Sequence, residues 1–315
     1  MKTKVNDKTN TDTAKSSSGG IKSSSEKAAN FIIHIIFILL CVVFLGSFLM
    51  ILGSSFQSQE DIMQHGYSII PRAFTLDAYK MILENNRILV DAYLVTILTT
   101  VVGTVVGVWI VASFGYVLSR RDYPYTKILS FYVFFTMLFH GGLVPTYILI
   151  SRWLGLKDNI LALIIPLLVS AWYIMIMKGF FSSIPTSLIE AGKIDGASEM
   201  YIFLKIVIPI SKPALATVAL FYTLSYWNDY WLSLLYIESS KLIKLQYLLM
   251  RVLQNAEFLN SAEALEYGAV TEGMEVPTLA ARMAMCVLAA GPILVIFPFF
   301  QKNFVTGLTL GSVKG

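Results

Sequence analysis

The chain has 315 residues, of which 56% are hydrophobic and 14% charged, and its mean hydropathy is +0.68. A water-soluble fold of this size could not bury so much apolar surface in one core, so the composition excludes an ordinary soluble enzyme. The formal net charge of +4 is too small to indicate nucleic-acid binding. Both cysteines, Cys41 and Cys286, lie inside apolar runs, which excludes a disulfide framework and a cysteine-based metal site.

The first thirty residues are rich in Lys, Ser, Thr and Asn and contain little apolar sequence, so a disordered tail is predicted for residues 1–30. Farther along, the chain alternates long apolar runs with shorter polar segments. A helix of about 20 apolar residues spans the hydrocarbon core of a bilayer. Six segments meet this requirement: residues 31–52, 93–118, 128–150, 160–177, 213–237 and 283–300. They predict an all-α polytopic membrane protein with six transmembrane helices, forming one membrane domain over residues 31–315.

Lysine and arginine indicate which loops are cytoplasmic, because cytoplasmic loops carry an excess of both. With the amino terminus inside, the inner segments include the lysine-rich tail and the cations of residues 119–127 and 178–212. The outer loop at 239–281 is acidic instead. Both termini are therefore predicted to be cytoplasmic, with residues 301–315 as a cytoplasmic C-terminal tail.

The predicted spans contain little reactive chemistry. Asp229 is the only acidic residue inside a predicted span. An ion-coupled carrier that uses Asp229 as its proton site is an alternative, but the spans contain no further carboxylates to form a pathway. The three histidines are isolated from one another in sequence, and no metal site is predicted. No phosphate-binding loop is found, since Gly192-Lys193 is followed by Ile194. The chain is predicted to be non-catalytic and to bind no cofactor itself.

The segment 178–212 is long and polar for an inner loop, and its pattern predicts two short helices separated by a break. Pro185 suits a first helical turn, and Ser187 with Glu190 three residues later has the form of a capping box. Asp195-Gly196 would end the first helix and cap the second.

Gly192 and Gly196 are four residues apart and would leave one stripe of this segment without side chains. A partner protein could then approach the backbone closely. An amphipathic helix lying on the cytoplasmic leaflet of the membrane is the alternative interpretation.

The pattern Glu190-Ala191-Gly192, three residues, Gly196, nine residues and Ile206-x-Ile208-Pro209 resembles the EAA loop in the membrane subunits of bacterial ABC importers. Gly192 replaces the family's second Ala and Ile208 replaces Leu, and both are small changes of volume. In that family the loop is a coupling helix seated in a cleft of a separate ATPase subunit. The resemblance implies an ATPase-coupling role for Glu190, Ala191, Gly192, Asp195, Gly196 and Ala197.

The carboxyl end, residues 307–315, resembles the Gly-rich tail of the carbohydrate-uptake branch, in particular the smaller membrane subunit of the maltose permease and permease subunits for oligosaccharides and lipo-oligosaccharides. There the tail reaches into the ATPase dimer, which implies such contacts for Gly307, Gly311, Lys314 and Gly315. The resemblance covers roughly residues 30–315 and implies the type I ABC importer transmembrane fold.

The same resemblance implies a permease subunit in a bacterial cell membrane that imports a carbohydrate, an oligosaccharide in the first instance, by alternating access. The implied partners are a second, homologous permease subunit, an ATPase dimer carrying ATP and Mg²⁺, and an external solute-binding protein that meets the loop at 239–281. A permease for a non-sugar solute is an alternative, because other ABC importers share the coupling loop.

Span five carries aromatic residues that suit a sugar, whose rings have apolar faces and polar edges. Aromatic rings at four-residue spacing would share one helical face, with two tryptophans beside them and an amide and a carboxylate between. The predicted substrate pathway comprises Tyr222, Tyr226, Trp227, Asn228, Asp229, Tyr230 and Trp231, with Trp172 and Tyr173 of span four as a weaker second candidate. An aromatic belt at the membrane interface is the other interpretation.

Small residues in two other spans predict packing and bends without chemistry. Gly103 and Gly107 form a Gly-x3-Gly pair of the kind that lets helices pack closely. Gly141-Gly142, Pro145 and Pro166 are predicted to mark bends.

Overall fold

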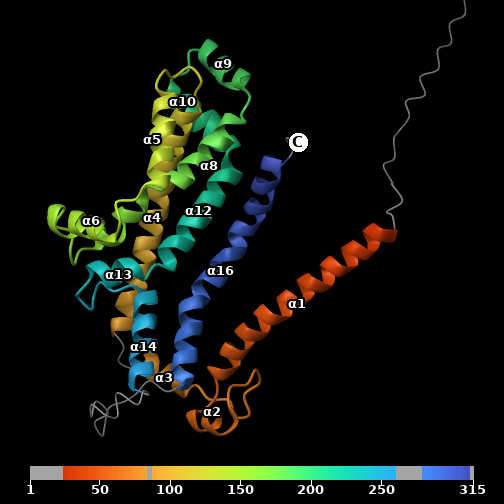
Figure 1. Cartoon of the computed structure of the whole chain (residues 1–315), viewed down its shortest axis with the longest axis vertical. Helices are drawn as coiled ribbons and strands as arrows, with labels where there is room; N and C mark the ends of the chain where they lie inside the picture. The colour runs from red at the N-terminus through yellow and green to blue at the C-terminus, as the bar shows by residue number, and fades with distance from the viewer. Residues whose placement is uncertain (1–23, 84–86, 260–278, 313–315) are drawn as a thin grey trace, which may run out of the picture. The chain divides into compact units, whose positions relative to one another are not determined.

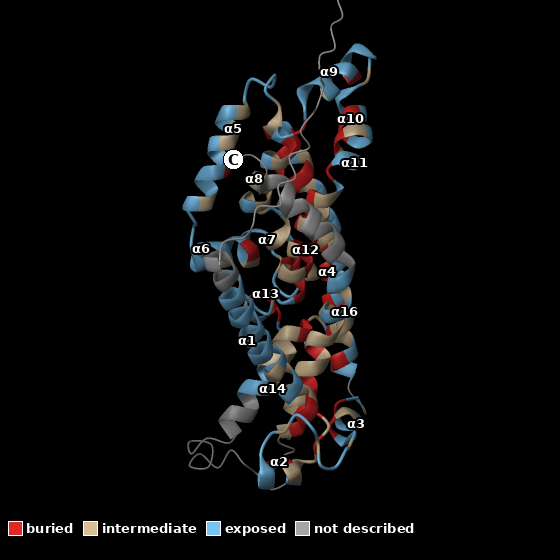
Figure 2. Cartoon of the chain, turned by 90° about the vertical axis from the view of Figure 1, so that its right-hand side faces the viewer, coloured by how far each residue is buried: buried red, intermediate tan, exposed pale blue. Residues whose placement is uncertain are grey.

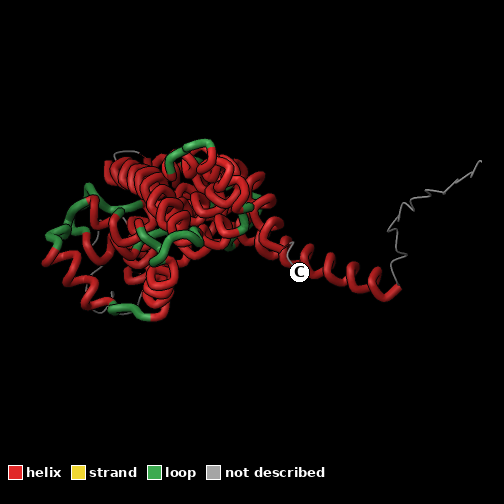
Figure 3. The backbone as a smooth tube through the Cα atoms, turned by 90° about the horizontal axis from the view of Figure 1, so that it is seen from above, coloured by secondary structure: helices red, strands yellow, loops and turns green. Residues whose placement is uncertain are grey.

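The computed structural model describes residues 24–83, 87–259 and 279–312. Within these ranges every regular element is a helix and no strand is found (Figure 3), which confirms the all-α prediction. The elements are α1 (Ser24–Ser54), α2 (Gln59–His65), α3 (Asp77–Leu83), α4 (Arg87–Ser119), α5 (Thr126–Leu138), α6 (Leu143–Ile148), η1 (Leu149–Trp153), η2 (Ile160–Leu163), α7 (Ile165–Leu168), α8 (Ala171–Ser182), α9 (Thr186–Ile194), α10 (Glu199–Ile202), η3 (Phe203–Val207), α11 (Ile208–Ile210), α12 (Lys212–Trp227), α13 (Trp231–Tyr236), α14 (Leu245–Leu259) and α16 (Leu279–Ser312).

The chain divides into two compact units, residues 1–49 and 50–315. The described part of the first unit belongs to α1, whose stretch Asn30–Ser54 has a mean hydropathy of 3.2. This helix begins at Ser24, earlier than the tail boundary predicted at residue 31. In the second unit α9 and α10 lie at one end and α2, α3 and α14 at the opposite end (Figure 1).

Three helices are long and apolar enough to cross a membrane, and the number rises to six if each of three bent helix pairs is one span. The long ones are Asn30–Ser54, Arg87–Ser119 and Leu279–Pro298. The described chain is thus a polytopic membrane protein, but three of the six predicted spans are broken rather than continuous.

The predicted span 128–150 is broken after α5, and the segment Leu143–Trp153 turns away by 109°. α5 ends at Leu138, and Gly142, the N-cap residue of α6, has a φ of +87°, which an L-residue rarely adopts and which turns the chain into α6. The span 160–177 is bent by 44° between Leu168 and Ala171. The first bend lies where the sequence predicted it, at Gly141-Gly142. The second lies at residues 169–170, whereas Pro166 is in the first turn of α7.

The predicted span 213–237 is not one helix either. α12 ends at Trp227, residues 228–230 are non-helical, and α13 is a separate short helix. The helical partner of α12 in its bent pair is the preceding segment Glu199–Ile210, at an angle of 82°. The outer part of span five is therefore a turn and a short helix.

The core of the second unit forms where α4 packs against α8 and α12. Val111, Met177 and Val218 are fully buried there, and buried residues follow α4 and α12 in Figure 2. Gly103 and Gly107 face the rings of Tyr226 and Tyr222, which confirms that this glycine pair serves helix packing.

Candidate functional site

The segment predicted to couple to an ATPase forms α9 at one end of the second unit (Figure 1). Pro185 stands just before the helix in extended backbone, at φ −56° and ψ 128°, and no side chain caps the first turn. The predicted capping box of Ser187 and Glu190 is therefore wrong, because Ser187 lies inside the helix. The first residues of the predicted loop 178–212 belong to α8, which continues to Ser182.

The break at Asp195-Gly196 is confirmed. Gly196 has a φ of +78°, and the NH groups of Gly196 and Ala197 donate to the carbonyls of Lys193 (3.0 Å) and Gly192 (2.9 Å). These two hydrogen bonds form a Schellman C-cap. Asp195 does not cap the second helix as predicted, since the side chain of Ser198 accepts the Tyr201 NH instead.

Gly192 is buried and faces the second helix of the loop, not an external partner. A Cβ at Gly192 would lie 3.2 Å from side-chain carbons of both Ile202 and Ile206. Around Gly196 the space is open. The two glycines thus have different structural roles. Gly192 permits close packing of α9 against the second helix of the loop, and Gly196 permits the turn that follows α9. Glu190 and Ala191 remain exposed on α9, where another protein could reach them.

Gly196→Ala is expected to loosen the loop, whereas Gly192→Ala is expected to be tolerated. A left-handed φ costs an L-residue about 1–2 kcal/mol, while the flexible ends of Ile202 and Ile206 can yield a few tenths of an ångström. Local opening measured as tryptic cleavage after Lys193 in the purified chain should rise roughly 5- to 30-fold for Gly196→Ala. Equal cleavage rates in the two variants would contradict this assignment.

Four charged side chains form a closed ring beside α9, which we call the charge ring: Arg120, Asp122, Lys193 and Glu199. Asp122 Oδ2 contacts Lys193 Nζ at 2.6 Å and Arg120 Nη2 at 2.7 Å. Glu199 Oε1 contacts the same two cations at 3.0 and 3.2 Å. The hydroxyl of Tyr116 donates to Glu199 Oε2 at 2.8 Å. The charge ring thereby joins α9 and α10 to the end of α4.

The charge ring keeps its charges over a wide pH range. The hydrogen bond from Lys193 holds the pKa of Asp122 at about 2 despite some burial. Burial would raise the pKa of Glu199, but hydrogen bonds from Lys193 and Tyr116 outweigh it and lower it. The Asp122 hydrogen bond raises the pKa of Lys193. Acids with a lowered pKa lose their stabilisation only as pH falls through the folded pKa, and a lysine with a raised pKa only as pH rises through it, so the ring is expected to stay charged across the neutral range.

A cavity of about 840 Å³ lies between α4, α5, α7, α8 and α12. Trp172 and Tyr173 of the second substrate-pathway candidate line it, and 59% of the Trp172 surface is exposed. The Tyr173 hydroxyl is 3.2 Å from the Ser225 hydroxyl. Further hydrogen-bonding side chains on the wall are Tyr132, Thr136, His140 and Ser170. Aromatic faces beside hydroxyl and imidazole groups are the chemistry that sugar rings need.

Tyr226 and Trp227 of span five do not line this cavity and lie in the core instead. Tyr226 is fully buried and its hydroxyl donates to the Ile164 carbonyl at 2.7 Å. Trp227 is 2% exposed, and its indole NH donates to the Ala289 carbonyl at 3.1 Å. Both rings are packed inside the core of the chain, so neither has an exposed face that a substrate could contact.

Tyr222 borders the cavity, but it is 1% exposed and its hydroxyl donates to the Leu168 carbonyl at 2.8 Å. Asn228, Tyr230 and Trp231 are exposed at the break after α12 and are not part of the cavity wall. Tyr230 does not share the face of Tyr222 and Tyr226, because the helix has already ended.

Asp229 is paired within the chain. Its Oδ2 lies 3.1 Å from Lys244 Nζ, and its Oδ1 accepts the NH of Leu232 at 3.2 Å. Lys244 is fully buried and also donates to the carbonyl of Tyr226. Sequence reasoning misses this partner, because Lys244 lies in the predicted outer loop, fifteen residues after Asp229. A carboxylate held by a buried ammonium is poorly placed to act as a proton site.

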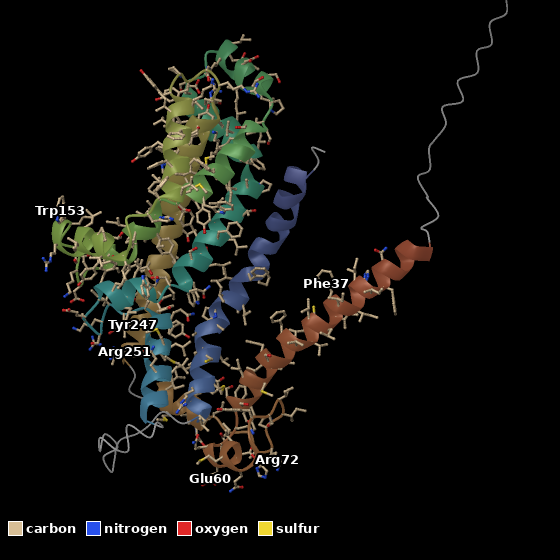
Figure 4. All side chains as sticks on the ribbon, in the orientation of Figure 1. Phe37, Glu60, Arg72, Trp153, Tyr247 and Arg251 are labelled. Atoms are coloured by element: carbon tan, nitrogen blue, oxygen red, sulfur yellow. The ribbon has the colours of Figure 1, made fainter. Side chains whose placement is uncertain are left out.

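The remaining predicted residues are less fully described. Gly307 and Gly311 lie in α16, which continues to Ser312, and Lys314 and Gly315 fall outside the described residues. The outer loop at 239–281 contains α14, whose Arg251 lies over the Tyr247 ring at 5.8 Å (Figure 4), and residues 260–278 also fall outside. Among the described residues no group of three or more His, Cys, Asp or Glu side chains is arranged to hold a metal ion.

The described fold is that of a polytopic membrane protein, and comparison with known proteins shows the class to which the chain belongs. The family model described as "Binding-protein-dependent transport system inner membrane component" matches residues 27–309. The chain belongs to this family, the permease subunits of ABC importers in the bacterial cell membrane. The family confirms the resemblance that the loop indicated, and it does not favour an ion-coupled carrier.

Individual relatives cover most of the chain. The polygalacturonan/rhamnogalacturonan transport system permease protein YtcP of Bacillus subtilis (strain 168) is 39% identical over 281 residues, covering 89% of this chain and 95% of that protein. Protein LplC of the same organism is 39% identical over 268 residues, covering 85% and 88%. A solved bacterial ABC transporter involved in the import of the acidic polysaccharide alginate has a TM-score of 0.76 at 28% identity, covering 90% of this chain and 98% of that one.

Proposed function

We propose that this permease subunit imports an oligosaccharide, and that the cavity between α4, α5, α8 and α12 is its share of the translocation pathway. The observation that carries the site is the exposed Trp172 ring beside the hydroxyl pair of Tyr173 and Ser225 in that cavity. Relatives named for the transport of polygalacturonan, arabinooligosaccharides and maltodextrin support a carbohydrate substrate. Fragments of polygalacturonan are the first substrate to test, because two of the relatives carry acidic polysaccharides.

The proposed mechanism is alternating access driven from outside the chain. A second, homologous permease subunit would close the other side of the pathway, and an ATPase dimer would bind ATP and Mg²⁺. Glu190 and Ala191 on α9 would contact the ATPase, and Gly196 would hold the turn after that helix. Closure of the ATPase dimer would move α9 and convert the cavity between inward- and outward-facing states. Both termini of the chain would be cytoplasmic, and a solute-binding protein would deliver substrate from outside.

The test is transport by the assembled complex in proteoliposomes. The chain, its partner permease, the ATPase and the binding protein are reconstituted and supplied with fragments of polygalacturonan. Uptake should require ATP and the binding protein, and Glu190→Ala should lower both uptake and ATP turnover while the chain still inserts. Uptake by this chain alone, driven by a pH gradient without ATP, would refute the proposal.

Trp172→Ala is expected to weaken substrate handling without affecting assembly. An aromatic platform contributes about 1 kcal/mol beyond its buried area, so half-maximal uptake should need roughly five times more substrate-loaded binding protein. The matched control is Trp153→Ala, because Trp153 is 81% exposed at the end of η1 and is not part of the cavity wall (Figure 4). Identical uptake curves for the two variants would remove Trp172 from the pathway.

A further inference from the structure

The proposed coupling helix has limited apolar attachment to the rest of the second unit. Of the residues in α9, Gly192 alone is buried, against the same loop's second helix, and Ile189 is partly buried against the core cluster. Ile194 at the end of α9 is 87% exposed. A helix attached in this way could swivel on its ends when a partner pushes it, unless polar contacts hold it.

The charge ring supplies those contacts and reaches into the core. Lys193 of α9 contacts Asp122, in the turn between α4 and α5, and Glu199 of α10. Glu199 accepts the hydroxyl of Tyr116, which is 7% exposed and belongs to the core cluster of α4, α8 and α12. Arg120 closes the ring and is 12% exposed at its side chain. The path from α9 to the buried part of α4 is therefore continuous.

We propose that the charge ring is the joint through which movement of α9 reaches α4, and that Lys193 is the residue that positions α9 for this transfer. The inference rests on the proposed function, in which an ATPase moves α9. Two carboxylates alternate with two cations, so each side chain has two opposite charges to hold it. Isolated surface ion pairs contribute little, but networks with a partly buried member hold their geometry better. Without Lys193, a movement of α9 would no longer be transmitted fully to α4.

The experiment compares uptake per ATP hydrolysed in the assembled transporter, with fragments of polygalacturonan as the probe. Lys193→Met should still bind the ATPase and hydrolyse ATP, while uptake per ATP falls at least about five-fold, the lower end of usual coupling factors. Lys193→Arg should retain coupling, because a guanidinium can contact both carboxylates. The matched control is Lys205→Met, which removes an exposed lysine from the same loop, outside the ion pairs of the described residues.

A second readout needs no substrate. Spin labels at Arg121→Cys and Ile194→Cys, in a Cys41→Ser, Cys286→Ser background, report the distance between the α4–α5 turn and the end of α9. We expect one narrow distance that is the same with and without ATP, and a broader distribution in Lys193→Met. Asp122→Asn should broaden the distance distribution as well, so this variant provides the test if Lys193→Met does not fold.

Several outcomes would overturn the inference. Unchanged uptake per ATP in Lys193→Met would show that the charge ring transmits nothing. Loss of ATPase binding in that variant would make Lys193 a docking residue instead. A distance that changes on ATP binding in the unsubstituted chain would mean that α9 moves independently of α4. Failure of the unsubstituted chain to bind any ATPase is a separate result, which would refute the proposed function.

Discussion

Lys244→Met is expected to destabilise the folded chain by about 3–5 kcal/mol, the usual cost of removing one member of a buried ion pair. Lys244 is fully buried, and Asp229 keeps 9% of its side-chain surface exposed. The substitution would leave the carboxylate without a counter-charge and the Tyr226 carbonyl, at the end of α12, without the ammonium. The turn after α12 would then lose its link to the start of α14.

The thermal midpoint of the purified complex measures this effect, with Lys241→Met as the control because Lys241 is exposed three residues away. Asp229→Asn should also destabilise, since it strands the buried ammonium, although Asn can still accept the Leu232 NH. The double variant Asp229→Asn/Lys244→Met should recover part of the loss, because neither charge remains unpaired. A Lys244→Met variant as stable as Lys241→Met would show that the pair contributes nothing.

Local signals in the sequence predicted a good part of the fold. The apolar run of α4 is long and uninterrupted, so its length and composition identify it as a span. The bend at Gly142 and the turn at Gly196 follow from the positive φ that glycine adopts readily. The role of Gly103 and Gly107 in helix packing follows from their spacing, because residues four apart along one helix share a face.

Contacts between distant segments could not be predicted in this way. The partner of Asp229 lies fifteen residues later, beyond a helix break that hydropathy does not reveal. The charge ring joins Asp122 to Lys193, which are 71 residues apart. The spacing of Tyr226 and Trp227 shows which aromatic rings follow one another along the helix, but not which face meets α4 and α16. It therefore does not separate these buried rings from Trp172 and Tyr173, which line the cavity.

Gly103→Ala is expected to destabilise the packing of α4 against α12. A Cβ at Gly103 would lie 2.3 Å from Cζ of Tyr226, far inside van der Waals contact. Tyr226 has no room to yield, because it is fully buried and its hydroxyl is bonded to the Ile164 carbonyl. Overpacking of this kind costs about 1–3 kcal/mol or more, against a gain of about 1 kcal/mol in helix propensity.

The thermal midpoints of three alanine variants should therefore rank in a fixed order. Gly107→Ala should be milder than Gly103→Ala, since its Cβ would lie 2.9 Å from the ring of Tyr222. Gly179→Ala in α8 should be neutral or stabilising, because nothing lies within 4 Å of that position. Adding Tyr226→Leu to Gly103→Ala should restore part of the stability by removing the ring that the methyl group meets. If Gly103→Ala were no less stable than Gly179→Ala, α4 and α12 would not pack as closely as the structure places them.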